Sequence, residues 1–206
     1  MLKSGIRQYL FFCLILTLSG CAQLSDLNMT HILYSIGIQS EARHINSIKI
    51  KTDQLLNQNK TEVALSILQN EIDGGIPLAK FSQQYSRAMN QTLDQASEKL
   101  NQQQNMQAGM LFRTALTHYP TTDFLDKKIN LTRDEISMEI DFCANRLLEA
   151  GLFAYRSGQL EEAINDWSKI RQFHPTYKAS QQAIQTTRTQ LKNLESLNKN
   201  QPENGT

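Results

Sequence analysis

Apolar residues recur every three or four positions through most of the chain, which is the spacing of one face of an α-helix. The positions between them are rich in neutral amides, since 36 of the 206 residues are Gln or Asn. The chain has 9 Gly, 4 Pro and 7% aromatic residues, too few turn and strand residues for an all-β sandwich. The pattern therefore predicts an all-α fold over about residues 39–197.

The most regular segment lies toward the C-terminus. Gly151, Ala163, Trp167 and Pro175 stand there at successive offsets of 12, 4 and 8 residues. This arrangement resembles the tetratricopeptide repeat, a pair of antiparallel helices about 34 residues long. Small residues at the first two positions let the helices approach closely, Gly158 permits the turn between them, and Trp167 fills the space toward the next element. Proline then ends the second helix, because it has no amide hydrogen.

The same template fits a second segment upstream, with Ala in place of the first Gly and Gln103 at the turn. Its matching residues are Ala96, Ala108, Phe112, Ala115 and Pro120.

A third, weaker copy has Thr52, Asn59, Ala64, Leu68 and Pro77, and its second helix begins with a sequence that is similar to a capping box, Asn59-Lys60-Thr61-Glu62. The three copies predict helical hairpins near 45–78, 89–122 and 144–177, stacked as a short solenoid. The alternative is three unrelated hairpins.

Extra residues separate the copies. The longest excess falls at about 121–132, where we expect either one long helix or an added short helix broken near Asn130-Leu131-Thr132. Thr132 and Glu135 have the spacing of a capping box. After the last copy, a narrow apolar stripe on a polar segment predicts a C-terminal helix that covers the final repeat. Residues 198–206 are expected to form a disordered tail.

The first 20 residues have the pattern of an export signal: Lys3 and Arg7 precede an apolar run too short to span a bilayer. The run ends in Leu18-Ser19-Gly20-Cys21, which resembles a bacterial lipobox. The resemblance implies cleavage between Gly20 and Cys21, lipidation of Cys21, and a tether over 21–38. An ordinary signal peptide or an uncleaved anchor are the alternatives.

Further inferences concern the compartment. By resemblance to lipoproteins of diderm bacteria, Ala22 after the lipidated cysteine implies sorting to the outer membrane, lipid-anchored and facing the periplasm, with exposure at the cell surface as an alternative. Cys143 would be the one unmodified cysteine left, so no internal disulfide is expected, and a buried apolar role is its default. The net charge of +1 becomes −1 when Lys3 and Arg7 are removed, which argues against nucleic-acid binding.

The sequence has no pattern that indicates catalysis. The histidines at 31, 44, 118 and 174 have no metal-ligand spacing, and His118 and His174 are instead expected to favour helix C-termini. Two acid pairs, Asp134-Glu135 and Glu161-Glu162, are expected to occupy first helical turns. We therefore expect no enzyme activity, cofactor, metal or small-molecule substrate.

Binding of a protein or peptide partner is the better prospect, because the first helices of such repeats line a groove. On the template, Asn46, Asn90 and Asn145 share one position, and Asn57, Asn101 and Arg156 share another. An asparagine both donates and accepts, so a ladder of them can hold an extended peptide; exposed Asn side chains that contact only water are the alternative.

These features together predict an envelope lipoprotein that uses a helical-repeat domain as an interaction adaptor or assembly factor. The alternative is a structural subunit of an envelope or of a secretion or pilus complex that self-associates.

Overall fold

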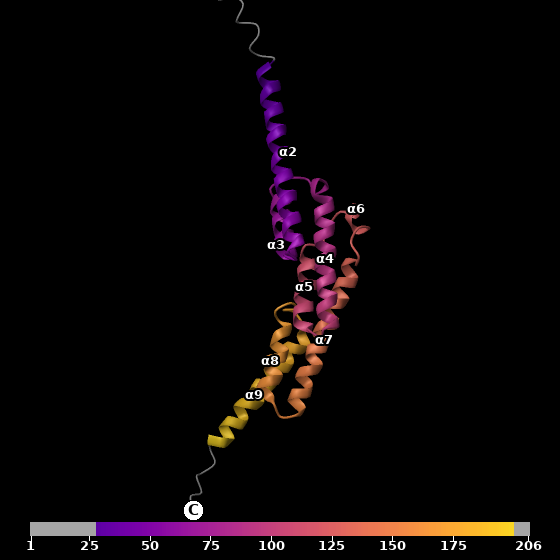
Figure 1. Ribbon diagram of the computed structural model, residues 1–206. Coiled ribbons are helices and arrows are strands. Elements are labelled where there is room, and N and C mark those ends of the chain that lie inside the picture. The colour runs from indigo at the N-terminus through magenta and orange to yellow at the C-terminus, as the bar shows by residue number, and fades with distance from the viewer. Residues whose placement is uncertain (1–27, 200–206) are drawn as a thin grey trace, which may run out of the picture. The chain divides into compact units, whose positions relative to one another are not determined.

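The computed structural model describes residues 28–199, and helices with their connecting turns account for that range, with no strand in it (Figure 1). This confirms the predicted all-α class. The elements are α2 (Asn28–Asn57), α3 (Thr61–Asp73), the 3-10 helix η1 (Leu78–Phe81), α4 (Ser82–Asn101), α5 (Asn105–Thr117), α6 (Asp123–Asp126), α7 (Arg133–Arg156), α8 (Leu160–Ile170) and α9 (Lys178–Lys199).

The predicted export signal, the lipidation site Cys21 and residues 200–206 of the predicted tail lie outside the described residues. Helical backbone extends further than expected at both ends of the described range. It occupies 28–38, where we predicted a tether, and it includes residues 198 and 199 of the predicted tail. Within 28–199, no helix is both long enough and apolar enough to cross a membrane.

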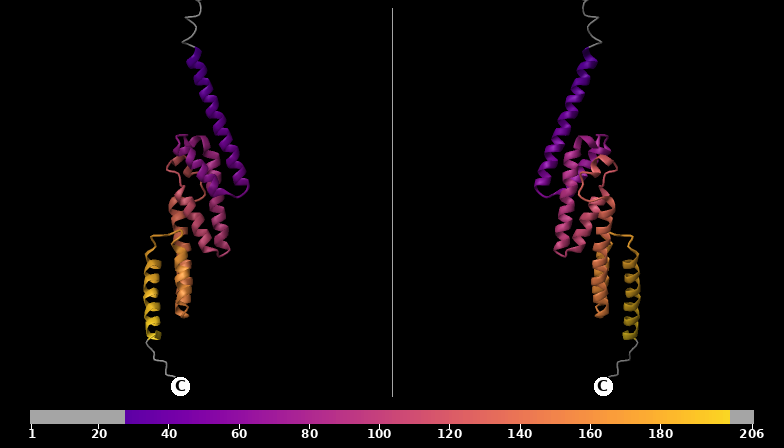
Figure 2. Two further views of the ribbon diagram at one scale, coloured as in Figure 1. Left: turned by 90° about the vertical axis from the view of Figure 1, so that its left-hand side faces the viewer. Right: turned by 90° about the vertical axis from the view of Figure 1, so that its right-hand side faces the viewer.

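The chain divides into two units within α2, the first ending at Ile48 and the second beginning at Lys49. In the second unit, each helix packs on its neighbours along the chain: α3 on α4, α4 on α5, α5 on α7, α7 on α8 and α8 on α9. Figure 2 shows α9 running beside the α7–α8 hairpin. The core of this unit is consequently a series of helix–helix seams.

The turns that join the paired helices have the same backbone geometry. The residue with a positive φ is Asn59 (59°), Gln103 (60°) or Gly158 (77°). This residue is the second one after the helix ends, and its amide donates to the carbonyl three positions earlier at 2.9–3.1 Å. The amide of the next residue donates to the carbonyl five positions before it at 2.9–3.0 Å. These are the bonds that close a helix C-terminus around a left-handed residue. The same turn therefore forms on three different sequences.

Residues at matching template positions of the paired helices are complementary in size. In each second helix, a large apolar residue is buried, and the residue 16 positions before it is small and also buried. The pairs are Gly151 with Trp167, Ala96 with Phe112, and Thr52 with Leu68. A methyl group built on Gly151 would lie 2.3 Å from the indole nitrogen of Trp167, so only Gly fits against that ring. As the first residue grows from Gly to Thr, its partner shrinks from Trp to Leu.

The template alanines on the second helices are also buried, as predicted. Ala64, Ala108 and Ala163 are fully buried. An additional close contact that the sequence did not reveal joins Gly109 of α5 to Phe173, whose ring would lie 2.6 Å from a methyl group on that glycine. Phe173 is itself fully buried. This contact fixes α5 against the segment that follows α8.

Several local predictions need correction. The helices α4 and α7 begin 7 and 11 residues before the predicted repeats at 89 and 144. The prolines at 77, 120 and 175 do not end the helices directly; they lie three to five residues beyond α3, α5 and α8. The side chains of Asn59-Lys60-Thr61-Glu62 form no N-cap on α3, because Lys60, which has no short acceptor side chain, takes the N-cap position and Asn59 adopts the positive φ of the turn.

The segment between the second and third hairpins is broken, in agreement with one of the two alternatives for 121–132. The short α6 is followed by a turn, and α7 begins after Thr132. Thr132 and Glu135 form a full capping box, with each side chain bonded to the backbone amide of the other. These bonds lower the pKa of Glu135. The predicted cap is confirmed, and it fixes where α7 begins.

Candidate functional site

The outward face of α7 is the most apolar exposed surface that we find on a single helix. The buried face of α7 carries Ile136, Ile140, Cys143, Ala144, Leu147, Gly151 and Ala154. The opposite face exposes Met138 (69%), Phe142 (47%), Leu152 (36%) and Phe153 (73%). Because these large apolar side chains are so exposed, about one face of α7 is not covered by the other residues that the structure describes.

The spacing along this face is regular. Met138, Phe142, Asn145, Glu149, Leu152 and Arg156 follow one another at steps of 4, 3, 4, 3 and 4 residues. Such alternation is the seven-residue repeat by which one helix packs along another. The 18 steps from Met138 to Arg156 correspond to about 27 Å of helix at about 1.5 Å per residue. We call these six residues together with Phe153 the α7 outer face.

Charged groups lie in the middle of the α7 outer face. Arg146 pairs with Glu149 at 3.8 Å, and its guanidinium carbon lies 5.7 Å from the centre of the Phe142 ring. Both ends of the pair are more than half exposed, so its contribution to stability is small. The pair is available to a partner.

A groove of about 760 Å³ adjoins this face. The α7 side is formed by Phe142, Arg146, Glu149 and Ala150, and the opposite wall by the turn between α4 and α5. That wall includes Asn101, the last residue of α4, together with Gln103 and Asn105. Asn101, one of the predicted groove residues, therefore does line a groove, next to the predicted turn at Gln103.

The other predicted groove asparagines are bonded within the chain. Asn90 donates to the carbonyl of Lys128 at 2.9 Å and accepts from the amide of Asn130 at 2.9 Å. Asn90 therefore does hold peptide backbone at two points, but the backbone is the segment of this chain that leads into α7. In this structure, the Asn90 side chain fixes that segment.

Asn57 and Asn145 each form a hydrogen bond to a residue about 30 positions later in the chain. The guanidinium of Arg87 on α4 donates to Asn57 at 2.7 Å, and it also lies 3.3 Å from Asp53. The hydroxyl of Tyr177 donates to Asn145 at 2.5 Å, and burial together with Asp141 raises the pKa of Tyr177. These asparagines join successive hairpins and do not form one continuous ladder. Asn145 is still exposed and belongs to the α7 outer face.

The remaining two predicted groove residues are placed separately. Asn46 is exposed in the first unit, and Arg156 is exposed at the end of α7. Arg156 shares the α7 outer face with Asn145. The sequence did not reveal that the apolar residues of this face are exposed, because Phe142 fits the same periodic pattern as the buried residues beside it. Only the tertiary packing shows which side of α7 is covered.

The groups with chemical potential are placed as structural residues. Cys143 is buried, which confirms its predicted role. This burial, and to a smaller extent the charge of Glu139, raises the pKa of its thiol to about 12. Asp134, Glu135, Glu161 and Glu162 occupy first turns as predicted. Among the residues described, no group of His, Cys, Asp and Glu has a geometry that could hold a metal ion.

The two histidines near helix ends differ. His118 directly follows α5 as its C-cap, as expected. His174 lies four residues beyond the end of α8, so the predicted interaction with that helix end is wrong. Its Nε2 instead lies 2.9 Å from a carboxylate oxygen of Asp141 on α7. The packing of the loop onto α7 decides the place of His174.

Comparison of the chain with protein-family models, with curated proteins and with solved structures finds no match.

Proposed function

We propose that this protein is a membrane-anchored envelope lipoprotein whose hairpins form a tetratricopeptide-like solenoid and bind a partner protein as an adaptor or assembly factor. The lipobox-like Leu18-Ser19-Gly20-Cys21 supports the anchor, and Ala22 after it supports the outer-membrane location. Several acyl chains on one cysteine hold a soluble domain at a bilayer, since each buried methylene contributes about 0.8 kcal/mol. The shared turns and the seams between successive helices support the repeat.

The α7 outer face carries the binding proposal. Its seven-residue spacing and its exposed Phe142 and Phe153 fit an amphipathic helix of the partner, which would lay its apolar side along α7. Asn145, Glu149 and Arg156 interrupt the apolar positions and would set the register of that helix. Aromatic side chains that are exposed in the free protein are the residues expected to dominate such an interface.

The direct test is photo-crosslinking in intact cells, with p-benzoylphenylalanine in place of Phe142 or Phe153. We expect one partner to be captured at both positions. Probes at the exposed positions Gln107 and Gln159 serve as controls and should capture it poorly. Equal capture at all four positions would contradict binding through the α7 outer face.

A variant pair then measures the contribution of this surface. Phe142→Asp with Phe153→Asp should weaken partner binding about tenfold or more while leaving the melting temperature nearly unchanged. The matched control is Val63→Asp with Met110→Asp, which alters two exposed apolar residues of α3 and α5. Similar losses in both variants would argue against a specific site.

The anchor is tested separately. Cys21→Ser should release the protein from membranes into the soluble envelope fraction, as followed by fractionation and immunoblotting. Persistent membrane association of this variant would refute the lipid anchor without bearing on the α7 outer face.

The second candidate, a structural subunit that self-associates, rests on the same exposed face, because two copies of α7 have the spacing to pair with each other. Light scattering separates the two. A mass that rises with concentration in the wild type, and stays monomeric in the Phe142→Asp, Phe153→Asp variant, would favour self-association over the adaptor.

A further inference from the structure

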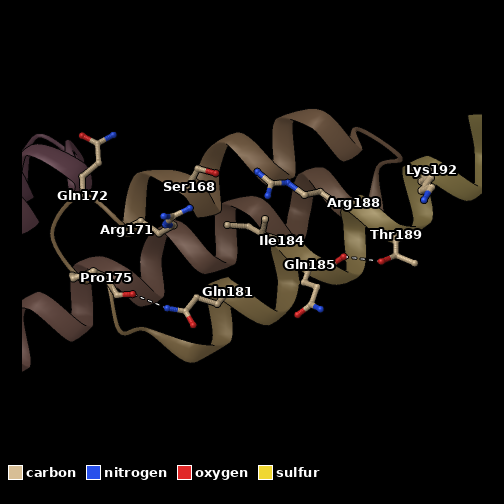
Figure 3. A pocket seen from close by; sticks show the side chains of 10 residues that line it. All are labelled: Ser168, Arg171, Gln172, Pro175, Gln181, Ile184, Gln185, Arg188, Thr189 and Lys192. Carbon is tan, nitrogen blue, oxygen red and sulfur yellow. Dashed lines mark hydrogen bonds between the residues drawn. The ribbon is translucent and has the colours of Figure 1, made fainter.

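A second groove, distinct from the α7 outer face, lies between α8 and α9 and has a volume of about 730 Å³ (Figure 3). Its floor includes Ile184, which is 5% exposed. Its walls come from the end of α8 and its following turn on one side and from α9 on the other. No function is attached to it by the preceding argument.

The groove is lined by cations without acids. Arg171, Arg188 and Lys192 contribute to it, and no Asp or Glu does. Of the residues that the structure describes, no carboxylate forms an ion pair with any of the three. A positive groove on a chain of formal net charge +1 is a local feature and not a reflection of overall composition.

Helix geometry brings the cations to one place. Ile184, Arg188 and Lys192 are spaced by four residues and so occupy one face of α9. Arg171 directly follows the last residue of α8. In Figure 3, Arg171 and Arg188 lie on either side of Ile184. The positive charges therefore flank an apolar floor.

Neutral polar side chains complete the lining. Gln172 and Gln185 supply amides that both donate and accept, and Ser168 supplies a hydroxyl. Gln181 is held in place by donating to the carbonyl of Pro175 at 2.6 Å. A phosphate group can only accept hydrogen bonds, whereas peptide backbone has both donors and acceptors. The mixture of amides and cations therefore fits an acidic peptide better than an isolated phosphate.

We propose that this groove binds an extended acidic peptide segment of a partner protein, with carboxylates on Arg171, Arg188 and Lys192 and backbone on the glutamine amides. The proposal rests on the proposed adaptor function only in assigning the segment to a protein partner. The distance along α9 from Gln181 to Lys192 is about 16 Å, at about 1.5 Å per residue. That length accommodates about five residues of extended chain.

The test uses the full chain in detergent and fluorescein-labelled hexaglutamate as the probe, measured by fluorescence anisotropy at low salt. The variant Arg171→Gln, Arg188→Gln, Lys192→Gln should bind the probe about tenfold more weakly or worse. Added salt should weaken binding by the wild type, because exposed charges are screened. A hexaglutamine peptide should not compete.

The matched control is Arg113→Gln, Lys178→Gln, Lys199→Gln, which removes the same number of charges outside the groove lining. It should retain wild-type binding, and circular dichroism should show equal melting of both triple variants. Equal weakening in the two variants, or no binding of hexaglutamate by the wild type, overturns the proposal.

Two further arms distinguish other anions. If inorganic phosphate competes as well as hexaglutamate, or if phosphatidylglycerol vesicles bind through the same three cations while hexaglutamate does not, the peptide assignment is overturned. Because the probe is synthetic and the crosslinking test concerns the α7 outer face, failure of either proposal leaves the result for the other intact.

Discussion

The α4–α5 and α7–α8 hairpins have the same turn and the same seam, built from different residues. In α7–α8, Gly151 lies against the indole of Trp167, and Gly158 holds the positive φ of the turn. In α4–α5, the corresponding seam residues are Ala96 and Phe112, and Gln103 holds the turn. The positions that hold Gly and Trp in one hairpin thus hold a larger first residue and a smaller ring in the other.

The comparison also separates two roles of glycine. Gly151 is needed because an aromatic ring fills the space where its side chain would be. A methyl group on Gly158 would have no neighbour within 4 Å, so the value of this glycine lies in its backbone conformation alone. Substitutions at these two positions should therefore fail for different reasons, and only one of them should be rescued by a change in a neighbour.

The largest effect is expected at the seam. Gly151→Ala should lower the free energy of unfolding by about 1–3 kcal/mol, because the methyl group overlaps the Trp167 ring. Adding Trp167→Phe recreates the Ala–Phe pair of α4–α5 and should recover much of that loss. Urea unfolding of both single variants and the double variant measures the coupling, which we expect to be about 1 kcal/mol or more. Strictly additive effects would show that the two hairpins do not share one packing rule.

A smaller effect is expected at the turn. Gly158→Ala should destabilise the chain by about 1 kcal/mol, because an L-residue costs about 1–2 kcal/mol in the left-handed region. Gln103→Gly should stabilise it, by less than that amount, because Gly loses more backbone entropy on folding. The two variants are compared by thermal melting. Destabilisation by Gln103→Gly would mean that its side chain contributes more to the turn than its backbone strain removes.

The smallest effect concerns pH. Burial lowers the pKa of His118, and Glu62 opposes this to a smaller extent. The unfolded chain therefore binds this proton more readily, so stability should be complete above about pH 6.5 and should fall as the pH drops below it. His118→Gln should reduce the loss of melting temperature between pH 7.5 and 5.5. Its backbone carbonyl, which accepts from Tyr85 at 2.6 Å, is retained in this variant. An unchanged pH dependence would exclude His118 as its source.

Local rules predicted much of the fold. Apolar periodicity predicted the paired helices, and the template located the turns at Asn59, Gln103 and Gly158 and the capping box at Thr132. The repeat template alone placed the starts of α4 and α7 too late, because both helices continue N-terminally beyond the repeat. For α7, the capping box at Thr132 gave the correct start. The prolines were also poor markers of the helix ends. The helical backbone ends three to five residues before each proline, so the proline ring is not what stops the helix.

The candidate site was predicted only in part. The sequence located Asn101 and Asn145 on surfaces that remain accessible, but it could not show that Asn90 is occupied by the backbone at 128–130. That segment lies about 40 residues away in the chain, and its approach depends on how α6 folds back. The cationic groove between α8 and α9 was missed because Arg171 lies 17 residues before Arg188 in the chain, and only the packing of α9 on α8 brings them together.

By itself, the sequence determined the helical class, because apolar periodicity is a local property of the chain. It predicted that Trp167 fills the space toward the next element, whereas the ring lies against Gly151 of the same hairpin, so that prediction was wrong. The tertiary structure decided which side of α7 is covered and which side presents Met138, Phe142 and Phe153. The reason is that apolar residues recur at helical spacing on two opposite faces of α7, so the spacing alone does not distinguish them. The neighbouring helices cover one of these faces and leave the other exposed.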